Sequence, residues 1–450
     1  MRARTSGSET PKRRPAARGS GRAPGRPRVD RAVLVDAAID TLSAAGPRGL
    51  TSVRVARAAG LAQSGFYRYF RNPDDCLRVV ADAVGDRLRA LHSELWRTML
   101  AADPADVDAT TRYYEAWLGA VLVERRAASL FFRHRNDPSP FGRAMTRHLD
   151  LMRADMTEWL AKIAASAGVA PGHERSIALL AELLLAEALG LCESLLEERR
   201  TDVAPVARAL ARSAVDATKA LVGSLLRAPA RSPLAKARSR RRAVAEEPPA
   251  AARERLLAAA VNVLRRDGPG GLTTVSVTRE AGIVQSGFYR HFKDVADCER
   301  AAAQRVAVEF RRVNRERRQR LLTANPTDRA RTAVYYEDLL TTALGADRHF
   351  SELYLQYRRE SSPLGKVARD FERAARKDIV AWLTDLGARF GLDAADGDRI
   401  EIQAELLWAG AFGLCEALLS GRVSDSTATA RLLADHAVVQ SARGFKRPVQ

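Results

Sequence analysis

Apolar residues recur at helical spacing in the first part of the chain that carries a clear pattern. Over 31–44 they fall three and four residues apart, which places them along one stripe of a helix. The glycine and proline cluster at 46–49 predicts the end of that helix. Thr51 then offers a hydroxyl to the free amides of a new short helix, 52–59, which Gly60 is expected to end.

A second short helix is predicted over 63–70, with Phe66 and Phe70 facing inward. Two short helices joined through a glycine turn and preceded by a supporting helix are typical of a helix-turn-helix, whose second helix fits the DNA major groove. The polar side chains expected on its outer face suit base edges and phosphate oxygens. An ordinary solvated helical corner would give a similar pattern.

The same pattern returns about 222 residues later. The run from Gln63 to Arg68 recurs unchanged from Gln285 to Arg290, and the sequence Gly-Leu-Cys-Glu at 190–193 recurs at 413–416 with one residue of length drift. Because chance similarity would not hold register across several helices, the chain contains two copies of one folded unit. The period is too long for a solenoid, so the repeat predicts a fused dimer.

The candidate DNA-binding residues lie at matched positions of the two copies. They are Thr51, Arg54, Gln63, Ser64, Tyr67 and Arg68 in the first copy, and Thr273, Gln285, Ser286, Tyr289 and Arg290 in the second. Glutamine suits adenine edges and arginine suits guanine or phosphate. Ser276 stands where the first copy has Arg54, which is the clearest difference nearby.

Leu50, Thr51, Gly60 and the run 66–70 together resemble the TetR family of one-component bacterial regulators. All return in the second half, with His291 in place of a tyrosine. The resemblance implies an all-helical DNA-binding head, a larger helical body with a small-molecule pocket, and a dimer interface made by the last two long helices.

Two departures from the family pattern concern the recognition helix. Ala62 and Val284 replace the usual hydroxyl residue before that helix, which removes a cap worth about 1 kcal/mol. Pro73 and Val295 replace a lysine early in the next helix, which removes one phosphate contact. These departures bear on DNA affinity rather than on the mode of binding.

The expected architecture is all-α, with two tandem TetR-like units packed as a pseudo-twofold intramolecular dimer. The expected segments are a disordered basic arm at 1–29, a first unit at 30–226 (head 30–73, body 74–226), a basic flexible linker at 227–252, and a second unit at 253–446 (head 253–295, body 296–446). The last helices of the units, 174–199 and 203–226 with copies 399–420 and 426–443, carry small residues that favour one four-helix bundle. Burial within each unit alone is the alternative.

The net charge of +19 is concentrated in two segments with almost no large apolar side chains. The arm contributes +8 and the linker +5, and neither segment can offset its ordering entropy by burial. Arg26 and Arg28 flank a proline as in the minor-groove core of an AT-hook. A merely solvated basic tail is the other interpretation.

Aromatic residues at helical spacing in both bodies suggest a ligand pocket with an arginine at its mouth, although such a stripe is more often plain core. The candidates are Tyr113, Trp117, Phe131, His134 and Arg135 in the first copy, and Tyr335, Tyr354, Tyr357 and Arg358 in the second. Because the copies diverge here, the two pockets are expected to bind different ligands, or only one binds. The expected effector is an apolar or aromatic compound.

Other classes of protein find little support. The four cysteines and seven histidines lack zinc spacing, and no nucleophile elbow, phosphate loop or zincin motif occurs, so no metal, cofactor or catalysis is predicted. No apolar run spans a bilayer and no secretory signal is evident, so a cytoplasmic, non-membrane protein is expected.

The sequence therefore predicts a sequence-specific transcriptional regulator, a ligand-released repressor that binds a near-palindromic double-stranded operator as a monomeric pseudo-dimer. Two alternatives stay open. The first is a ligand-binding or interaction protein on the same fold that has lost operator specificity. The second is a DNA-coating protein with little sequence preference.

Overall fold

The computed structural model describes residues 30–101, 103–135, 139–227, 252–325, 327–360, 362–389 and 397–444. The first half contains α1 (Arg31–Gly49), α2 (Ser52–Ala58), α3 (Gln63–Phe66), α4 (Pro73–Ala101), α5 (Val107–Val123), α6 (Arg125–His134), α7 (Pro140–Ser166), α8 (Glu174–Leu196) and α9 (Val203–Arg227). The second half contains α10 (Ala252–Asp267), η1 (Pro269–Gly271), α11 (Thr274–Ala281), α12 (Gln285–Phe288), α13 (Val295–Ala324), α14 (Arg329–Thr341), η2 (Thr342–Ala346), α15 (Arg348–Tyr357), α16 (Pro363–Arg389), α17 (Gly397–Leu419) and α18 (Ser426–Gly444). These residues form helices and no strand, which confirms the all-α prediction.

The predictions for the basic arm and most of the linker concern residues outside this description. Residues 1–29, with Arg26 and Arg28, and residues 228–251 are not among the described ranges. The minor-groove contact proposed for the arm therefore stays a prediction.

Each head has the local geometry that its glycines and threonines predict. Gly46, Gly60 and Gly282 have φ angles of 68°, 70° and 62°, which are left-handed values that residues with a Cβ rarely adopt. Thr51 and Thr273 each accept a hydrogen bond from a backbone amide of the following helix. As a result, α2 and α11 begin one residue after a threonine and end close to a glycine.

The recognition segment differs slightly from its predicted extent of 63–70. The α-helix proper covers only Gln63–Phe66, but the amides of Tyr69 and Phe70 donate to the Phe66 carbonyl at 3.0 and 3.1 Å. One further helical turn therefore follows α3. This turn buries Phe70 beside Phe66, as the sequence predicts.

The one residue of length drift between the copies has a definite location. In the first body, α5 passes through Glu124 into α6, whereas in the second body a π-helical turn, η2, lies between α14 and α15. A π-turn accommodates one inserted residue without ending the helical path, and such turns occur frequently at functional sites. The insertion therefore leaves the flanking helices of the two copies in register.

The last two helices of both units form a four-helix bundle, with α8 packed on α17. A Cβ on Gly190 would collide with Ala409, and a Cβ on Gly413 would collide with Ala186. Gly190 and Gly413 are matched positions of the repeat, as are Ala186 and Ala409, so these two contacts are reciprocal. Reciprocal contacts are the signature of two-fold symmetry, and they confirm the predicted pseudo-twofold packing.

One buried contact in this bundle departs from the symmetry. The Glu187 carboxylate accepts a hydrogen bond from Ser213 of its own unit at 2.6 Å and lies 2.6 Å from His436 Nε2 of the other unit. The position matched to Glu187 in the second copy is Gly410. The contact therefore exists on one side of the pseudo-twofold axis only.

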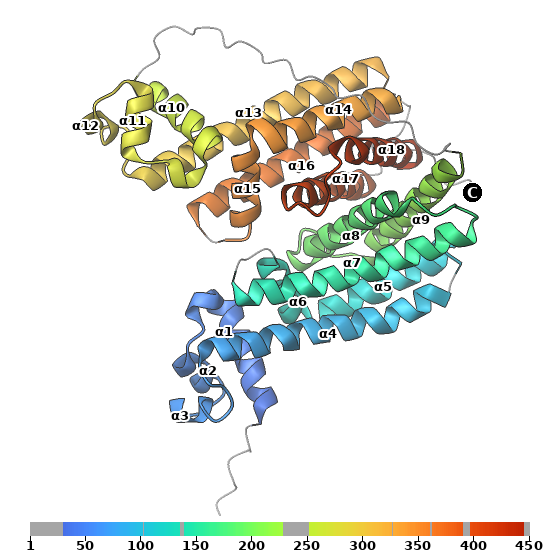
Figure 1. Ribbon diagram of the computed structural model, residues 1–450, viewed down its shortest axis with the longest axis horizontal. Coiled ribbons are helices and arrows are strands. Elements are labelled where there is room, and N and C mark those ends of the chain that lie inside the picture. The colour runs from blue at the N-terminus through green and yellow to red at the C-terminus, as the bar shows by residue number, and fades with distance from the viewer. Residues whose placement is uncertain are drawn as a thin grey trace, which may run out of the picture.

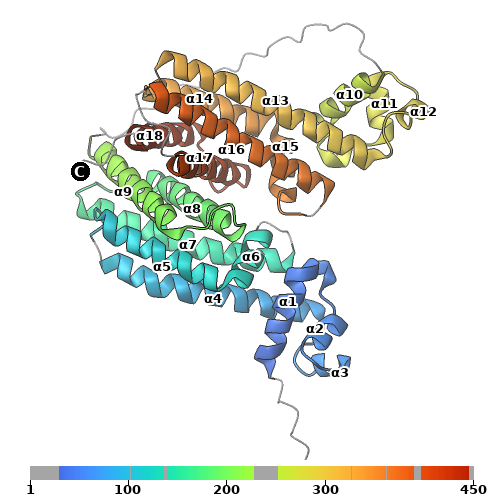
Figure 2. The ribbon, with the colours of Figure 1, turned by 180° about the vertical axis from the view of Figure 1, so that it is seen from behind.

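The bundle lies in the middle of the molecule and both heads lie at one end, at left in Figure 1 and at right in Figure 2. Residues of the first body form one apolar cluster with residues of α14, α16, α17 and α18, so the core crosses the boundary between the units. Of the described helices, only α17 is long and apolar enough to cross a membrane, and 56% of that stretch is buried in this core. This burial is typical of a central bundle helix.

Candidate DNA-binding heads and effector cavity

The predicted recognition side chains are exposed in both heads. Gln63, Ser64, Tyr67 and Arg68 are exposed around α3, and Gln285, Ser286, Tyr289 and Arg290 are exposed around α12. Tyr67 and Tyr289 are 51% and 59% exposed, which is unusual for large aromatic side chains on stable helices. Each head thus presents the same four side-chain types to solvent.

The two recognition segments are held differently. The Gln63 amide and the Tyr67 hydroxyl both donate to Ser52 Oγ, each at 3.2 Å. In the second head Thr274 takes the place of Ser52, and within the described ranges no hydrogen bond joins it to Gln285 or Tyr289. The first head is therefore more pre-organised, at the cost of engaging two of its recognition side chains.

The difference between Arg54 and Ser276 is also structural. Arg54 is exposed and its guanidinium donates to the Gly49 carbonyl at 3.3 Å. Ser276 instead completes a capping box, because its hydroxyl accepts from the Thr273 amide at 2.9 Å and its own amide donates to the Thr273 hydroxyl. Only the first head keeps a cation at this position.

The missing cap before each recognition segment is confirmed. Ala62 and Val284 occupy the N-cap positions of α3 and α12, and neither supplies a side-chain hydrogen bond to the helix. The first amides of α3 and α12 therefore receive no hydrogen bond from an N-cap side chain. A DNA phosphate is the acceptor that a helix N-terminus attracts.

The second body contains an apolar cavity of about 100 Å³. Residues from α13, α14, η2, α15, α16, α17 and α18 line it, and aromatic side chains dominate the lining. The aromatic members are Phe310, Tyr335, Tyr336, Phe350, Tyr354, Phe371, Trp382, Trp408 and Phe412. The π-turn η2 contributes Ala343, so the inserted residue lies beside the cavity.

A few polar atoms converge on this apolar space. Arg318 donates to the Tyr335 hydroxyl at 2.9 Å and has no ion pair within the described ranges. Asn314 is buried and its amide nitrogen donates to the Phe310 carbonyl, which leaves the buried Oδ1 without a donor. Arg311 and Asp378 neutralise each other through two hydrogen bonds of 2.8 and 3.0 Å. The cavity therefore offers one unpaired cation and one free acceptor.

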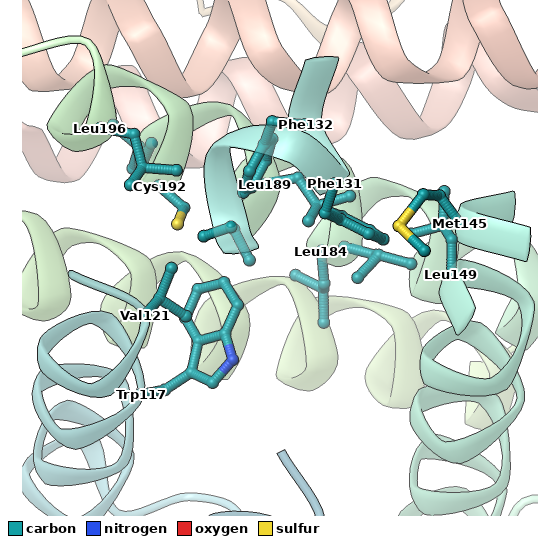
Figure 3. Packing of buried hydrophobic residues seen from close by; sticks show 14 of the residues in the cluster. Trp117, Val121, Phe131, Phe132, Met145, Leu149, Leu184, Leu189, Cys192 and Leu196 are labelled. Atoms are coloured by element: carbon teal, nitrogen blue, oxygen red, sulfur yellow. The ribbon is translucent and has the colours of Figure 1, made fainter. Parts of the chain in front are cut away.

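The matching space in the first body is mostly filled. Trp117 and Trp96 occupy the positions of Leu339 and Arg318, and the remaining cavity measures about 40 Å³. Figure 3 shows Trp117 and Val121 facing the side chains of the helices opposite. Burial lowers the pKa of His92, which stacks on Trp96, and the nearby Asp155 carboxylate opposes this effect.

The predicted pocket residues fall into three groups. Trp117 and Phe131 line the first cavity, and Tyr335 and Tyr354 line the second, as expected. Tyr113, His134 and Tyr357 line neither cavity. Arg135 and Arg358 are not at a pocket mouth, because both are buried in a separate polar cavity between the units.

The polar residues of the second cavity were not predicted from the sequence. Arg311, Asn314 and Arg318 follow one another on α13 at spacings of three and four residues, so they share one face of that helix. The signal available in the sequence was an asparagine that shares a helix face with two arginines.

Comparison with known proteins agrees with this arrangement. The family model described as bacterial regulatory proteins, tetR family, matches residues 34–80 and 256–298. Each match runs through one complete helix-turn-helix head into the following long helix. Each half of the chain therefore contains one head that matches the model of the tetR family of bacterial regulatory proteins. No curated protein matches the chain.

Solved structures that resemble the chain each correspond in length to about one unit. The fatty acid degradation regulator FadR from Bacillus halodurans has 14% identity and a TM-score of 0.34, over 41% of this chain and 98% of its own. FadR from Bacillus subtilis, solved with stearoyl-CoA, has 13% identity and a TM-score of 0.33, over 42% and 97%. A transcriptional regulator from Rhodococcus sp. Rha1 has 22% identity and a TM-score of 0.31, over 43% and 95%.

Proposed function

We propose that this protein is a ligand-released repressor that holds a near-palindromic operator with α3 and α12 of a single chain. One observation carries the proposal: two recognition segments with the same exposed side chains lie at the same end of one molecule. Two such segments suit successive turns of one face of B-form DNA. The protein acts as a monomer in the cytoplasm.

The operator has two nearly identical half-sites, because the same four side-chain types read both. Arg54 adds a phosphate or base contact on one side only, which skews one half-site. Since the heads are covalently joined, the second contact is intramolecular and occupancy does not depend on association of separate chains.

The effector binds in the second body. At roughly 10–15 Å³ for each water-sized position, the cavity there takes a ligand of about seven to ten non-hydrogen atoms. The aromatic lining suits an aromatic ring, Arg318 suits an acidic group, and Asn314 Oδ1 suits a hydroxyl or amine. A small aromatic acid with a hydrogen-bond donor meets all three requirements.

Release of DNA follows from the position of α13. This helix begins at Val295, six residues after Tyr289, and carries Arg311, Asn314 and Arg318 at the cavity. A ligand that moves this face of α13 also moves the head at its N-terminus. It releases DNA if it binds the rearranged state more tightly than the DNA-bound state.

The DNA-binding part is tested by selecting bound sequences from random duplex DNA with the full-length protein. The expected result is one class of site, with two similar half-sites whose centres lie about one or two helical turns apart. Selection of a single unpaired half-site contradicts the proposal. Equal binding of selected and random competitor DNA supports the DNA-coating alternative.

The effector part is tested at one matched pair of positions, where Trp117 fills the first cavity and Leu339 leaves the second cavity open. Leu339→Trp fills the second cavity and should abolish release of DNA by aromatic acids while operator binding persists. Trp117→Leu, the reverse exchange in the first body, is the matched control and should leave release unchanged. Gel shifts with a panel of aromatic acids measure operator binding and its release for both variants. If only Trp117→Leu loses the release of DNA, the effector does not bind in the second cavity.

A further inference from the structure

A second cavity lies between the two units, beside the α8 and α17 pair, and has a volume of about 60 Å³. Its lining combines small residues of the bundle with eleven charged side chains from both units. The charged residues are Arg135, Arg153, Glu182, Glu193, Arg199, Arg358, Glu372, Arg376, Glu405, Glu416 and Arg422. Trp408 and Phe412 also line the aromatic cavity of the second body, so the two cavities are neighbours that differ in polarity.

All but one of these arginines have a carboxylate partner within 4 Å. The pairs are Arg153 with Glu182, Arg199 with Glu372, Arg358 with Glu193, Arg376 with Glu372, and Arg422 with Glu182 and Glu416. Arg135 has no ion pair among the described residues, and its buried Nη1 has no hydrogen-bond partner. Only 6% of this arginine is exposed.

The sequence explains why Arg135 lacks a partner while its matched residue, Arg358, has two. In the second unit Glu372 lies 3.9 Å from Arg358 and accepts from the Tyr354 hydroxyl at 2.7 Å. In the first unit the same two positions hold Leu149 and Phe131. Figure 3 shows these two side chains together with Met145 in an apolar layer. The first unit has thus exchanged a carboxylate and a hydroxyl for hydrocarbon but has kept the arginine.

The surrounding charges do not compensate for this loss. Burial lowers the pKa of Arg135 to about 9, and repulsion from Arg359 and Arg358 contributes. Glu193 is engaged by hydrogen bonds from both of those arginines, at 2.8 to 3.3 Å. The Glu193 and Glu416 carboxylates oppose this lowering, but neither forms an ion pair with Arg135 among the described residues, so Arg135 is a buried cation without a direct partner. A buried unpaired charge is costly, so an external partner is strongly favoured.

We propose that this inter-unit cavity binds a small oxyanion, a carboxylate or a tetrahedral phosphate or sulfate, through Arg135. At roughly 10–15 Å³ for each water-sized position, its volume suits about four to six non-hydrogen atoms. Arginine presents planar N–H donors that match oxyanion geometry. Because residues of both units line the cavity, the anion links the two bodies across their interface. The proposal does not rest on the aromatic effector or on DNA binding.

The test is thermal unfolding of the full-length protein without DNA. Sodium acetate, sodium phosphate or sodium sulfate is titrated in a cationic buffer, with ionic strength held constant by sodium chloride. At least one oxyanion at a concentration well above its Kd should raise Tm by about 2 °C more than chloride does. The acetate arm and the phosphate and sulfate arms distinguish the two kinds of oxyanion.

Two variants should abolish this shift. Arg135→Met removes the cation, and the double variant Phe131→Tyr with Leu149→Glu installs the internal carboxylate that the second unit already has. Arg133→Met, an exposed arginine on the same helix, is the control and should keep the shift. An equal shift in all four proteins would reflect general salt effects and would overturn the proposal.

Crystals of the wild-type protein grown with selenate provide a direct readout that does not depend on the folding of any variant. A selenium anomalous peak within hydrogen-bond distance of Arg135 Nη1 supports the site. If phosphate or sulfate gives the thermal shift, water alone at that position at a saturating selenate concentration overturns the site; if only acetate gives the shift, bromoacetate and its bromine anomalous signal replace selenate in the same test.

Discussion

The two heads of this protein have stayed almost the same, whereas the two bodies have become different. Both recognition segments expose the same side-chain types, but the first body is filled by Trp96 and Trp117 and the second body keeps an open cavity. The difference indicates which constraint acts on each part. The proposed function accounts for this difference, because two similar half-sites would require similar heads, whereas one effector would require only one pocket.

The ionic contacts between the units show the same one-sidedness. Glu193 of the first unit binds Arg358 and Arg359 of the second, whereas its matched residue, Glu416, lies no closer than 3.7 Å to an arginine. Burial opposes ionisation of Glu193, but these two guanidiniums and that of Arg135 hold its pKa well below the ordinary range. The interface is symmetric in its small residues and asymmetric in its charges.

The largest expected effect comes from breaking this ionic contact. Glu193→Ala removes the carboxylate that the buried Arg358 and the half-buried Arg359 share, and should lower the free energy of unfolding by about 3–5 kcal/mol. Glu416→Ala, the matched change, should cost clearly less because no arginine is hydrogen-bonded to that carboxylate. Urea unfolding followed by circular dichroism measures both, and equal losses would show that the charge asymmetry has no energetic weight.

The heads should respond alike to matched substitutions. Arg68→Ala and Arg290→Ala should each weaken operator binding by about 1–3 kcal/mol, or roughly 5- to 150-fold. Fluorescence anisotropy with the selected operator measures the loss. A large effect of one variant and none of the other would mean that only one head reads DNA.

Helix capping separates the heads more finely. Thr273→Ala removes the capping box of α11 and should cost about 1 kcal/mol, and Thr51→Ala removes a single longer hydrogen bond and should cost somewhat less. Thermal unfolding of both variants checks this order. A greater loss from Thr51→Ala would contradict it.

The smallest effect concerns pH and involves only the first body. Because the pKa of buried His92 is lowered, protonation favours the unfolded state, and stability should fall as pH drops below about 6.5. His92→Asn installs the residue that the second copy has at this position, Asn314, and should reduce that fall. The pKa of His148 is lowered as well, by burial and then Arg89, so part of the fall should remain. The free energy of unfolding of the wild type and of His92→Asn, measured at pH 5.5 and 7.5, tests this. If the difference between the two pH values is the same in both proteins, His92 does not contribute.

The sequence was most informative where a pattern is local or repeated. Helix limits, the glycine turns and the bundle helices follow from spacing, from φ angles that only glycine adopts easily, and from matched registers. Small residues such as Gly190 predicted the interface because close approach leaves no room for a side chain. Each of these signals depends on few residues at short range.

The sequence was least informative where several helices converge. The second cavity depends on which side chains seven elements bring together, and Arg318 is hidden in an arginine-rich helix. Arg135 and Arg358 were expected beside an effector because they follow the aromatic run. Their burial between the units depends on the crossing of α8 and α17, which no local pattern encodes.

Fusion of the two halves also changes what mutation can do. In an assembly of identical subunits every substitution occurs twice, so glutamate at the Glu187 position would face a second glutamate rather than glycine. Here Gly410 leaves space for Leu183 and Glu187, and His436 occupies the position that is Ser213 in the first copy. A single gene encoding both sides can therefore explore interface chemistry one residue at a time, including pairings that an evolving homodimer cannot reach.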